Sequence, residues 1–417
     1  TYIASRNANS DANNSGISLP ALMLRMSASG SKTTSSTISG GMSDFSIKLY
    51  KGFTGGGNRQ VELFVNGVSK GTSTPFDDFS EHIFTVSGIN VSGDIVIEIL
   101  NITSKQIIID DISWTGYSPP TTTVPDDNFE AYLETHTAAG AVVSVGDANS
   151  MGDGIANNDL VTTANISGVI RINLQNQNIA DLTGIEDFTS LTLLNCYDNQ
   201  LTSLDISAIS SLATLKCYNN QITSLDVTQN TSLVSLDCQN NQITTLDLTW
   251  NTGLTTLQCQ SNQLISLDLT QNINLTFLRC ESNQLTSLDL TNNTSLNYFY
   301  CDNNQLSALD LSNNNGLIRL SAHSNQLTSL TVSNMPNLNE LFCQNNQLSN
   351  LDVRTGNNSS MSIFQASNNP NLICISVDDA NWATTNWTTA NGNIDAQTSF
   401  SNDCNLDADF SADVTTV

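Results

Sequence analysis

Aromatic, acidic and basic side chains gather between residues 277 and 342 of this chain. Aromatic faces can stack on sugar rings or anchor a protein partner. Guanidinium and carboxylate groups beside them can add paired hydrogen bonds to the same ligand. We therefore interpret this cluster as a candidate binding site for a glycan or another protein. Its members are Phe277, Arg279, Glu281, Tyr298, Tyr300, Asp302, Arg319, His323, Glu340 and Phe342.

Catalytic chemistry has little support in the sequence. The three histidines, His82, His136 and His323, are far apart and fall on different expected elements. We find no nucleophile elbow, zinc-binding motif, phosphate-binding loop or paired-carboxylate motif. We therefore expect this segment not to be an enzyme. Serine or carboxylate groups that only folding would bring together stay open at this point.

A similarity to a calcium-binding loop occurs at Asp147, Asn149 and Asp153. Met151 stands where such a loop needs a ligand, and no acidic residue follows at the twelfth position. We therefore favour a polar loop over a calcium site, and we expect no cofactor.

The charge balance excludes several classes of partner. The chain carries 39 acidic residues against 13 Lys and Arg, a net charge of −26, although only 12% of its 417 residues are charged. So few cations do not provide the basic surface that duplex nucleic acid or an anionic membrane requires. No apolar run approaches the length of a membrane span, so we expect no membrane insertion.

An internal repeat positions the clustered residues. A 21-residue unit with the pattern Leu-x-x-Leu-x-Cys-x-x-Asn-Gln-Leu recurs eight times from Leu191, with Ala322 at the Cys position of one copy. Degenerate copies at Val169 and Met361 bring the total to ten coils. This is the leucine-rich-repeat signature, with Cys at the third Leu position. Each coil should contribute one short strand to a parallel sheet with a spacing of ~4.8 Å. The period leaves no room for a helix on the opposite side, so we expect extended or turn structure there.

Two polar columns follow from the repeat. An Asn at the turn out of each strand is expected to satisfy buried backbone groups of neighbouring coils. An Asp on the opposite side stacks on like charges, and we expect its carboxylate to accept hydrogen bonds from turn N–H groups. A ladder of bound cations is the alternative for this second column. The Asn column is 199, 220, 241, 262, 283, 304, 325 and 346, and the Asp column is 205, 226, 247, 268, 289, 310 and 352.

The scarce cations of the repeats favour one face. Counted from the first Leu of each coil, positions 3, 5 and 7 should point out of the concave side of the sheet. Four of the five basic residues occupy position 3 or 5, and Arg354 is the exception; the four are Arg171, Lys216, Arg279 and Arg319. This concentration favours a binding face over a surface of unrelated charges.

A simpler interpretation of the cluster is that its charges only neutralise one another. Arg279 and Glu281 would then form a solvated ion pair. Arg319 would pair likewise with Asp302 or Glu340. Such pairs contribute ~0–1 kcal/mol each to stability, and the aromatic side chains would merely be tolerated on a sheet.

The nine cysteines divide into two groups. Seven recur at one repeat position, where strand spacing of ~4.8 Å exceeds the ~3.8 Å that disulfide Cβ atoms require. We interpret them as buried free thiols that act as small apolar side chains rather than as a metal or redox ladder. The remaining two, Cys374 and Cys404, are expected to form a disulfide in a C-terminal cap, which implies an oxidising compartment.

The first part of the chain has a different pattern. Alternating apolar residues predict strands at 45–49, 61–65, 82–86, 94–100 and 106–110, and Asn66-Gly67 predicts a hairpin turn. We infer an antiparallel β-sandwich of jelly-roll type. Apolar residues at helical spacing then predict a short helix that covers the exposed end of the solenoid, with His136 as a packing residue. These are Phe129, Tyr132, Leu133 and His136.

The expected fold is thus predominantly all-β, a jelly-roll-like sandwich followed by a leucine-rich-repeat solenoid with a short N-terminal cap helix. The domain boundaries that we predict are 1–118 for the sandwich, 119–125 for a Pro/Thr-rich linker, 126–168 for the N-terminal cap, 169–375 for the ten coils, 376–405 for the C-terminal cap, and 406–417 for a linker or the start of a following domain.

Several motifs resemble secreted leucine-rich-repeat proteins of Bacteroidota, especially flavobacteria. They are Val124-Pro-Asp-Asp-Asn-Phe-Glu, Leu182-Thr-Gly-Ile-Glu-Asp-Phe, the Cys-bearing Asn-Gln-Leu repeats and Asn371-Leu-Ile-Cys-Ile-Ser-Val-Asp-Asp. The first domain is similar to sandwich modules of secreted nucleases and adhesins in those organisms, and Ala408-Asp-Phe-Ser-Ala-Asp-Val is similar to the first strand of a PKD-type domain. The resemblance implies that this chain is part of a longer extracellular or outer-surface protein that is exported by type IX secretion. It also implies that the first strand of the sandwich domain precedes Thr1.

Three functions remain in competition on the sequence alone. The first is a non-catalytic binding or adhesion segment whose concave sheet holds a glycan or protein. The second is an accessory region of a larger secreted enzyme, such as a nuclease, with its catalytic domain elsewhere. The third is a rigid spacer in a surface assembly.

Overall fold

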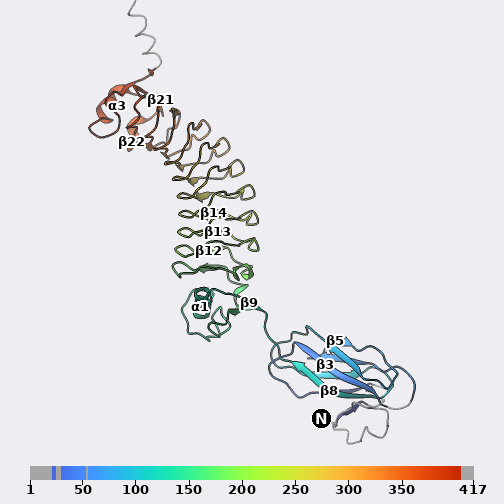
Figure 1. Cartoon of the computed structure of the whole chain (residues 1–417). Coiled ribbons are helices and arrows are strands. Elements are labelled where there is room, and N and C mark those ends of the chain that lie inside the picture. The colour runs from blue at the N-terminus through green and yellow to red at the C-terminus, as the bar shows by residue number, and fades with distance from the viewer. Residues whose placement is uncertain (1–20, 25–29, 53–54, 405–417) are drawn as a thin grey trace, which may run out of the picture. The chain divides into compact units, whose positions relative to one another are not determined.

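The computed structural model describes residues 21–24, 30–52 and 55–404. The chain divides into two compact units, Thr1–Pro120 and Thr121–Val417, which Figure 1 shows in blue to turquoise and in turquoise to red. The expectations about the start of the first domain and about residues 406–417 lie outside the described residues.

The first unit is a jelly-roll sandwich of two four-stranded antiparallel sheets, in the strand orders β1-β8-β3-β6 and β2-β7-β4-β5. This confirms the predicted fold, since a jelly roll pairs eight strands in this order. Asn66 and Gly67 adopt φ of 51° and 77°, as the predicted hairpin turn requires. The strands are β1 Leu22–Leu24, β2 Ser31–Thr34, β3 Asp44–Lys51, β4 Val61–Val65, β5 Val68–Thr72, β6 His82–Val86, β7 Ile97–Asn101 and β8 Ile107–Thr115.

The second unit is a leucine-rich-repeat solenoid, and its coils stack into a ten-stranded parallel sheet. The middle residue of each three-residue strand is buried, for example Leu278 and Phe299, so the two flanking side chains lie on the outer face of the sheet. The strands are β11 Arg171–Asn173, β12 Leu193–Asn195, β13 Thr214–Lys216, β14 Ser235–Asp237, β15 Thr256–Gln258, β16 Phe277–Arg279, β17 Tyr298–Tyr300, β18 Arg319–Ser321, β20 Glu340–Phe342 and β22 Ile363–Gln365.

The opposite side of the coils is extended or turning, as the 21-residue period predicts. A second sheet of four parallel strands forms there toward the C-terminal end, in the order β19-β21-β23-β24. Its strands are β19 Ser329–Thr331, β21 Asn350–Asp352, β23 Cys374–Ser376 and β24 Ser399–Ser401. Short 3-10 turns η2 Ile185–Asp187 and η3 Asn358–Ser360 complete the coils.

The Asn column joins the coils through its side-chain amides, as predicted. The Nδ2 of Asn283 donates to the carbonyls of Cys259, Cys280 and Glu281 at 3.1, 3.1 and 3.3 Å. Its Oδ1 accepts the N–H of Leu264 at 3.0 Å. Each such Asn therefore satisfies four backbone groups that no strand partner reaches.

A second Asn column, which sequence analysis did not identify, runs through the opposite turns. Its members are fully buried, and each donates to two carbonyls of preceding coils. Asn272, for example, reaches the carbonyls of Leu248 and Asn251 at 3.1 and 3.0 Å. The column is Asn230, Asn251, Asn272, Asn293 and Asn314.

The seven ladder cysteines are free and buried in the solenoid core. Burial raises the pKa of Cys196, Cys238 and Cys343 to about 12. The thiols are therefore neutral and shielded from oxidants, which confirms their role as packing residues.

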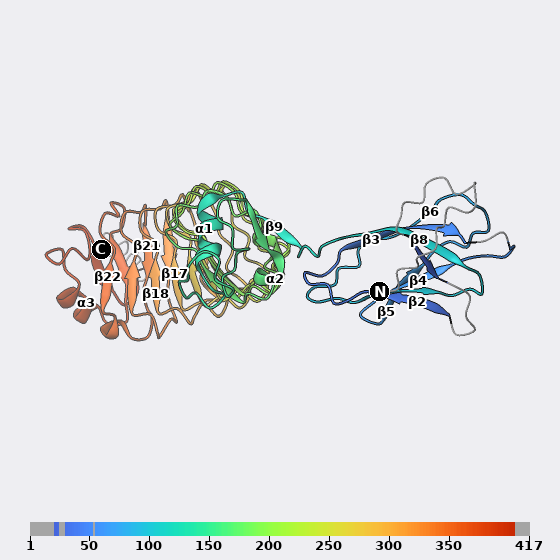
Figure 2. The same cartoon turned by 90° about the horizontal axis from the view of Figure 1, so that it is seen from below.

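Caps close both ends of the solenoid core. The helix α1 Asp127–Thr135 lies at the N-terminal end of the coils (Figures 1 and 2), and its Phe129 and Leu133 join the same core. Asp126 accepts the N–H groups of Asn128 and Phe129 at 3.0 Å. The cap also contains the antiparallel strands β9 Thr121–Thr123 and β10 Leu160–Thr162 and the helix α2 Thr163–Ile166.

At the other end, α3 Ala380–Asn386 belongs to the C-terminal cap. Trp387 follows this helix and stacks on Phe364 of β22, with ring centroids 4.1 Å apart. The structure also joins Cys374 to Cys404 by a disulfide. Aromatic stacking and a covalent link thus hold the cap on the last coils.

Candidate ligand-binding site

The structure brings the ten candidate residues onto four adjacent strands of one sheet. Seven of them flank the buried middle residue of β16, β17, β18 or β20. The other three follow β16, β17 and β18 by two residues: Glu281, Asp302 and His323. In-register pairing places Phe277 beside Tyr298 and Arg279 beside Tyr300. The repeat itself therefore aligns the side chains of neighbouring coils.

The centre of the cluster is a row of stacked cations and rings. The guanidinium carbon of Arg279 lies 5.2 Å from the Tyr300 ring centroid, and that of Arg319 lies 5.0 Å from it. Arg319 is also 5.0 Å from the Phe342 ring. Distances within about 6 Å allow favourable cation–π attraction. Tyr300 is thus held between two guanidinium groups.

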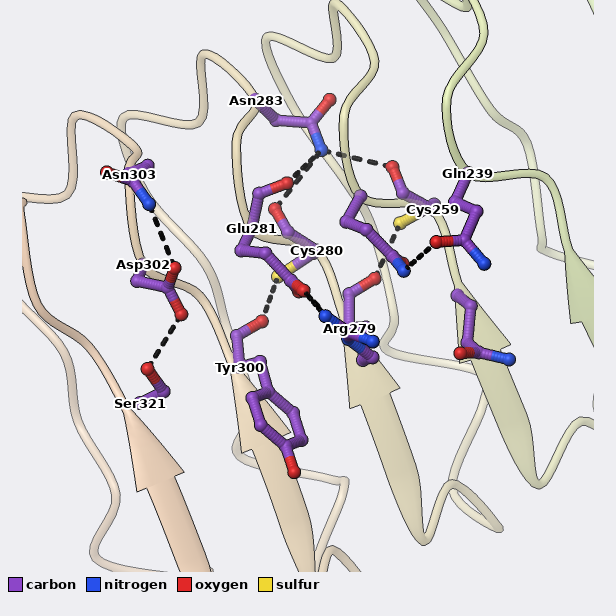
Figure 3. Close-up of polar contacts among 12 residues, drawn as sticks. Gln239, Cys259, Arg279, Cys280, Glu281, Asn283, Tyr300, Asp302, Asn303 and Ser321 are labelled. Atoms are coloured by element: carbon purple, nitrogen blue, oxygen red, sulfur yellow. Dashed lines mark hydrogen bonds and ion pairs between the residues drawn. The ribbon is translucent and has the colours of Figure 1, made fainter. Parts of the chain in front are cut away.

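Two ion pairs predicted from the sequence form. Arg279 binds the carboxylate of Glu281, its Nε at 2.7 Å from Oε1 (Figure 3). The Nη1 of Arg319 lies 2.7 Å from Oε2 of Glu340. Each arginine of the cluster therefore has a carboxylate beside it as well as a ring.

The alternative pairing of Arg319 with Asp302 is wrong, because other groups hold Asp302. Its Oδ1 accepts the hydroxyl of Ser321 at 2.7 Å, and its Oδ2 accepts the Nδ2 of Asn303 at 2.9 Å. His323 Nε2 lies 3.3 Å from the same Oδ2. The side chain of Asp302, at position 7 of its coil, thus contacts Ser321 at position 5 of the next coil.

Burial differs sharply within the cluster. Glu281 is only 7% exposed, whereas Tyr298 is 39% exposed. Burial raises the pKa of the Glu281 carboxyl, although Arg279 opposes this shift. Its Oε2 has no hydrogen-bond partner among the described residues. The site thus combines an exposed aromatic edge with a desolvated carboxylate behind it.

Asp237 on β14 is another buried acid on this sheet, besides Glu281. Sequence analysis did not identify it. Asp237 is 5% exposed, and its Oδ2 accepts from the amides of Gln239 and Gln258, each at 3.3 Å. Burial raises the pKa of its carboxyl. The signal in the sequence was an acid at position 5, among coils that otherwise present Ser, Thr and Gln.

Chemically, the side chains of this face are suited to binding. The aromatic rings offer stacking surfaces, and the paired charges offer hydrogen bonds in both senses. His323 is hydrogen-bonded to Ser324 at 3.0 Å and paired with Asp302, so its ring is held within the sheet face.

The acidic residues that come closest to a metal-ligand geometry are not the predicted ones. Within the described ranges, the group with ligand atoms within 4.8 Å of one another is Asp127, Glu130 and Asp159. Glu130 already accepts the N–H groups of Asn158 and Asp159, each at 3.1 Å. These hydrogen bonds, which hold the loop at Asn158 and Asp159 against α1, account for the proximity of the three acids.

The three residues of the suggested calcium loop make local hydrogen bonds. Asp147 accepts from the backbone and the side chain of Asn149, at 2.8 and 3.0 Å. Asp153 accepts the N–H of Ile155 at 2.9 Å and the Nδ2 of Asn158 at 2.9 Å. These contacts are those of a polar loop, the favoured interpretation, and calcium binding stays a prediction of lower rank.

The Asp column accepts hydrogen bonds from its own turns, as predicted. Asp226 accepts the hydroxyl of Thr228 at 2.7 Å and its N–H at 2.9 Å. These bonds lower the pKa of Asp226, because they stabilise the ionised form. The pKa values of Asp205, Asp247, Asp268, Asp289 and Asp310 are lowered in the same way.

Acid should therefore weaken the solenoid. A carboxyl group whose pKa is lower in the folded state contributes stability above its unfolded pKa of about 4, and loses it as the pH falls through the folded value. Asp237 and Glu281 have the opposite effect on stability. Their pKa values are raised in the folded state, so their protonation at lower pH favours folding. The residues of the Asp column outnumber these two acids. We therefore expect the urea concentration at the unfolding midpoint to decrease when the pH drops below about 4.

A triple Asn variant of Asp247, Asp268 and Asp289 tests this expectation. The amide oxygen of Asn still accepts the turn hydrogen bonds but does not titrate. Its urea midpoint, followed by circular dichroism at pH 6, 4 and 3, should decline less than that of the parent. Equal declines would show that other groups cause the acid sensitivity.

Three solved structures are similar to the solenoid. The functional domain of InlJ from Listeria monocytogenes, described as including a cysteine ladder, is 25% identical with a TM-score of 0.32, over 63% of this chain and 78% of that domain. A leucine-rich-repeat protein of Leptospira interrogans is 23% identical with a TM-score of 0.41, over 46% of this chain and 56% of that protein.

The third is the ectodomain of the Arabidopsis thaliana receptor kinase GASSHO1/SCHENGEN3, solved in complex with Casparian strip integrity factor 2. It is 21% identical with a TM-score of 0.41, over 48% of this chain and 28% of that chain. The chain thus spans less than two thirds of the second and third proteins. No protein-family model and no curated protein matches the sequence. The leucine-rich-repeat fold rests on the strand register of the chain itself.

The helices of the described part of the chain also bear on membrane insertion. None of its helices has both the length and the apolar character that a span requires.

Proposed function

We propose that the solenoid is a non-catalytic binding or adhesion segment that holds a glycan or a protein on the outer face of strands β16, β17, β18 and β20. The observation that carries this proposal is the row in which Tyr300 lies between Arg279 and Arg319. Charged and aromatic side chains are concentrated there, while the flanking coils present mainly small polar groups.

The exposure of the aromatic edge supports binding over simple charge neutralisation. Tyr298 is 39% exposed beside Phe277, with ring centroids 6.0 Å apart. Ion pairing alone would explain the arginines and acids, but it gives no reason for exposed rings beside them. Rings with a polar rim are typical of contact surfaces for sugars and proteins.

We further propose an extracellular or outer-surface location, as part of a longer protein of Bacteroidota exported by type IX secretion. The disulfide between Cys374 and Cys404 supports an oxidising compartment. The organism and the secretion route rest on the motif resemblance alone.

A binding screen with matched variants tests the proposed site. The full chain is screened on a glycan array and against extracellular proteins, and any hit is repeated with Tyr298, Tyr300 and Arg319 replaced together by Ala. We expect this triple variant to lose ligand retention. The control replaces Tyr197 and Tyr218, a stacked pair on the same face with centroids 4.3 Å apart, by Ala.

The control variant should bind like the parent protein, and both variants should keep the parent's circular dichroism spectrum. Unchanged binding by the triple variant would refute the site. No hit at all from a folded chain would favour a rigid spacer, and an adjoining catalytic domain in the complete gene would favour the accessory region of a secreted enzyme.

A further inference from the structure

A cavity of about 740 Å³ lies at the N-terminal end of the same sheet, away from the aromatic cluster. Its walls come from the first two strands, β11 and β12, and from the cap segment around residues 137–140. Five strand spacings of ~4.8 Å, or about 24 Å, separate β11 from β16. The cavity is therefore a separate site from the one proposed above.

Backbone hydrogen bonds fix the cap wall of this cavity. The N–H of Thr137 donates to the carbonyl of Ala141 at 2.9 Å, and that of Gly140 donates to Thr137 at 2.8 Å. The N–H of Met151 donates to the carbonyl of His136 at 2.9 Å. The ring of His136 stacks on Tyr132, with centroids 3.9 Å apart. A wall held in this way can present a preformed pocket.

Most of the lining is apolar. Tyr132, Met151, Ile170 and Leu193 line the cavity. Ile170 is 58% exposed. An exposed aliphatic side chain in a hollow favours a ligand with an apolar group of its own.

Arg171 is the charged residue of the lining. Arg279, Arg319 and Arg354 each have a carboxylate partner. For Arg171, in contrast, the described part of the chain shows no ion pair and no hydrogen bond from its side chain. An exposed, uncompensated guanidinium in a region with an excess of acids is available for an anionic ligand.

Amide groups stand beside this guanidinium. Asn173 and Asn195 also line the cavity, and the Oδ1 of Asn195 is buried with no partner within the described residues. An amide pair can donate to one carboxylate oxygen while its carbonyl accepts an N–H of the same ligand. A peptide end, which carries a carboxylate and an adjacent N–H, matches this combination.

We propose that this cavity binds the C-terminal carboxylate of a peptide whose last side chain is apolar. Arg171 pairs with the carboxylate through two N–H groups, the amides of Asn173 and Asn195 complete the hydrogen bonds, and the aliphatic walls take the terminal side chain. An acidic sugar offers the carboxylate but not the apolar group, so the lining favours the peptide.

Fluorescence anisotropy with short labelled peptides tests the proposal on the full chain. The probe is fluorescein-Gly-Gly-Gly-Leu with a free C-terminal carboxylate, compared with its C-terminal amide and with the same acid ending in Gly. We expect the free acid ending in Leu to bind at least 10-fold more tightly than either comparison peptide. Binding should weaken as salt is raised, since a charge pair contributes to it.

The variant Arg171→Met should weaken binding of the free acid at least 10-fold, whereas the control Lys216→Met should not. Arg171 is exposed, so the melting temperature should stay that of the parent. Equal affinity for acid and amide, no binding of the acid, or retention by Arg171→Met would overturn the proposal. So would stronger binding of an oligoglucuronate in competition. None of these outcomes bears on the aromatic cluster, because a different set of variants tests that cluster.

Discussion

Replacing Asn283 by Ala is expected to lower the free energy of unfolding of the solenoid by about 3–5 kcal/mol. The change removes one acceptor and two donor N–H groups that reach four backbone groups of two coils. The N–H of Leu264 would stay buried without a partner. An unsatisfied buried group costs about 1–3 kcal/mol, and the three carbonyls lose a shared donor as well.

The position of Asn283 in the middle of the solenoid makes the effect large. Neighbouring coils stabilise each other mainly through their common interface, so a defect in a central coil weakens two interfaces. Urea unfolding followed by circular dichroism measures the change. The matched control is Asn292→Ala, whose exposed amide donates a single bond to the carbonyl of Thr270 at 3.0 Å.

The control should cost less than about 1 kcal/mol, because water replaces its one lost bond. Similar losses for the two variants would contradict the role of the Asn column as the link between coils. A broadened transition for Asn283→Ala would indicate that the halves of the solenoid unfold separately.

The fold was largely predictable because both units carry strong periodic signals. Alternating apolar residues in β4, together with Asn66 and Gly67, specify a hairpin by local rules alone. The 21-residue repeat fixes the strand register, since each Leu that points inward can pack only on its equivalents in adjacent coils. Both the inward Leu column and the turn Asn column follow from that single constraint.

The partners of individual polar side chains were less predictable. Asp302 lies within reach of two coils, and its choice of Ser321 and His323 over Arg319 depends on side-chain conformations that a repeat pattern does not contain. The second Asn column had a visible 21-residue period at Asn272 and its equivalents, so it could have been found. The cavity beside Arg171 could not, since its cap wall has no repeat.

The cysteines should give a thiol count that separates the two groups. We expect seven thiols in the unfolded, unreduced protein and nine after reduction, because Cys374 and Cys404 are joined. The native protein should react hardly at all with a thiol reagent, since burial raises the pKa of the ladder thiols. Nine free thiols before reduction would rule the disulfide out.

Replacing Cys374 and Cys404 together by Ser should destabilise the C-terminal cap by about 3–4 kcal/mol. The bond joins residues that are 30 positions apart. A cross-link over a loop of this length reduces the entropy of the unfolded chain, which corresponds to about 3–4 kcal/mol of stabilisation. Hydrogen exchange should accelerate in β23, β24 and α3 while the central coils change little, since each coil contacts mainly its neighbours.

The double variant Cys259→Ala/Cys280→Ala is the contrast. It removes two core sulfurs and no cross-link, so its faster exchange should centre on β15 and β16 instead. Uniform acceleration along the solenoid in the first variant would mean that the cap and coils unfold as one unit, and that the disulfide protects the whole binding face.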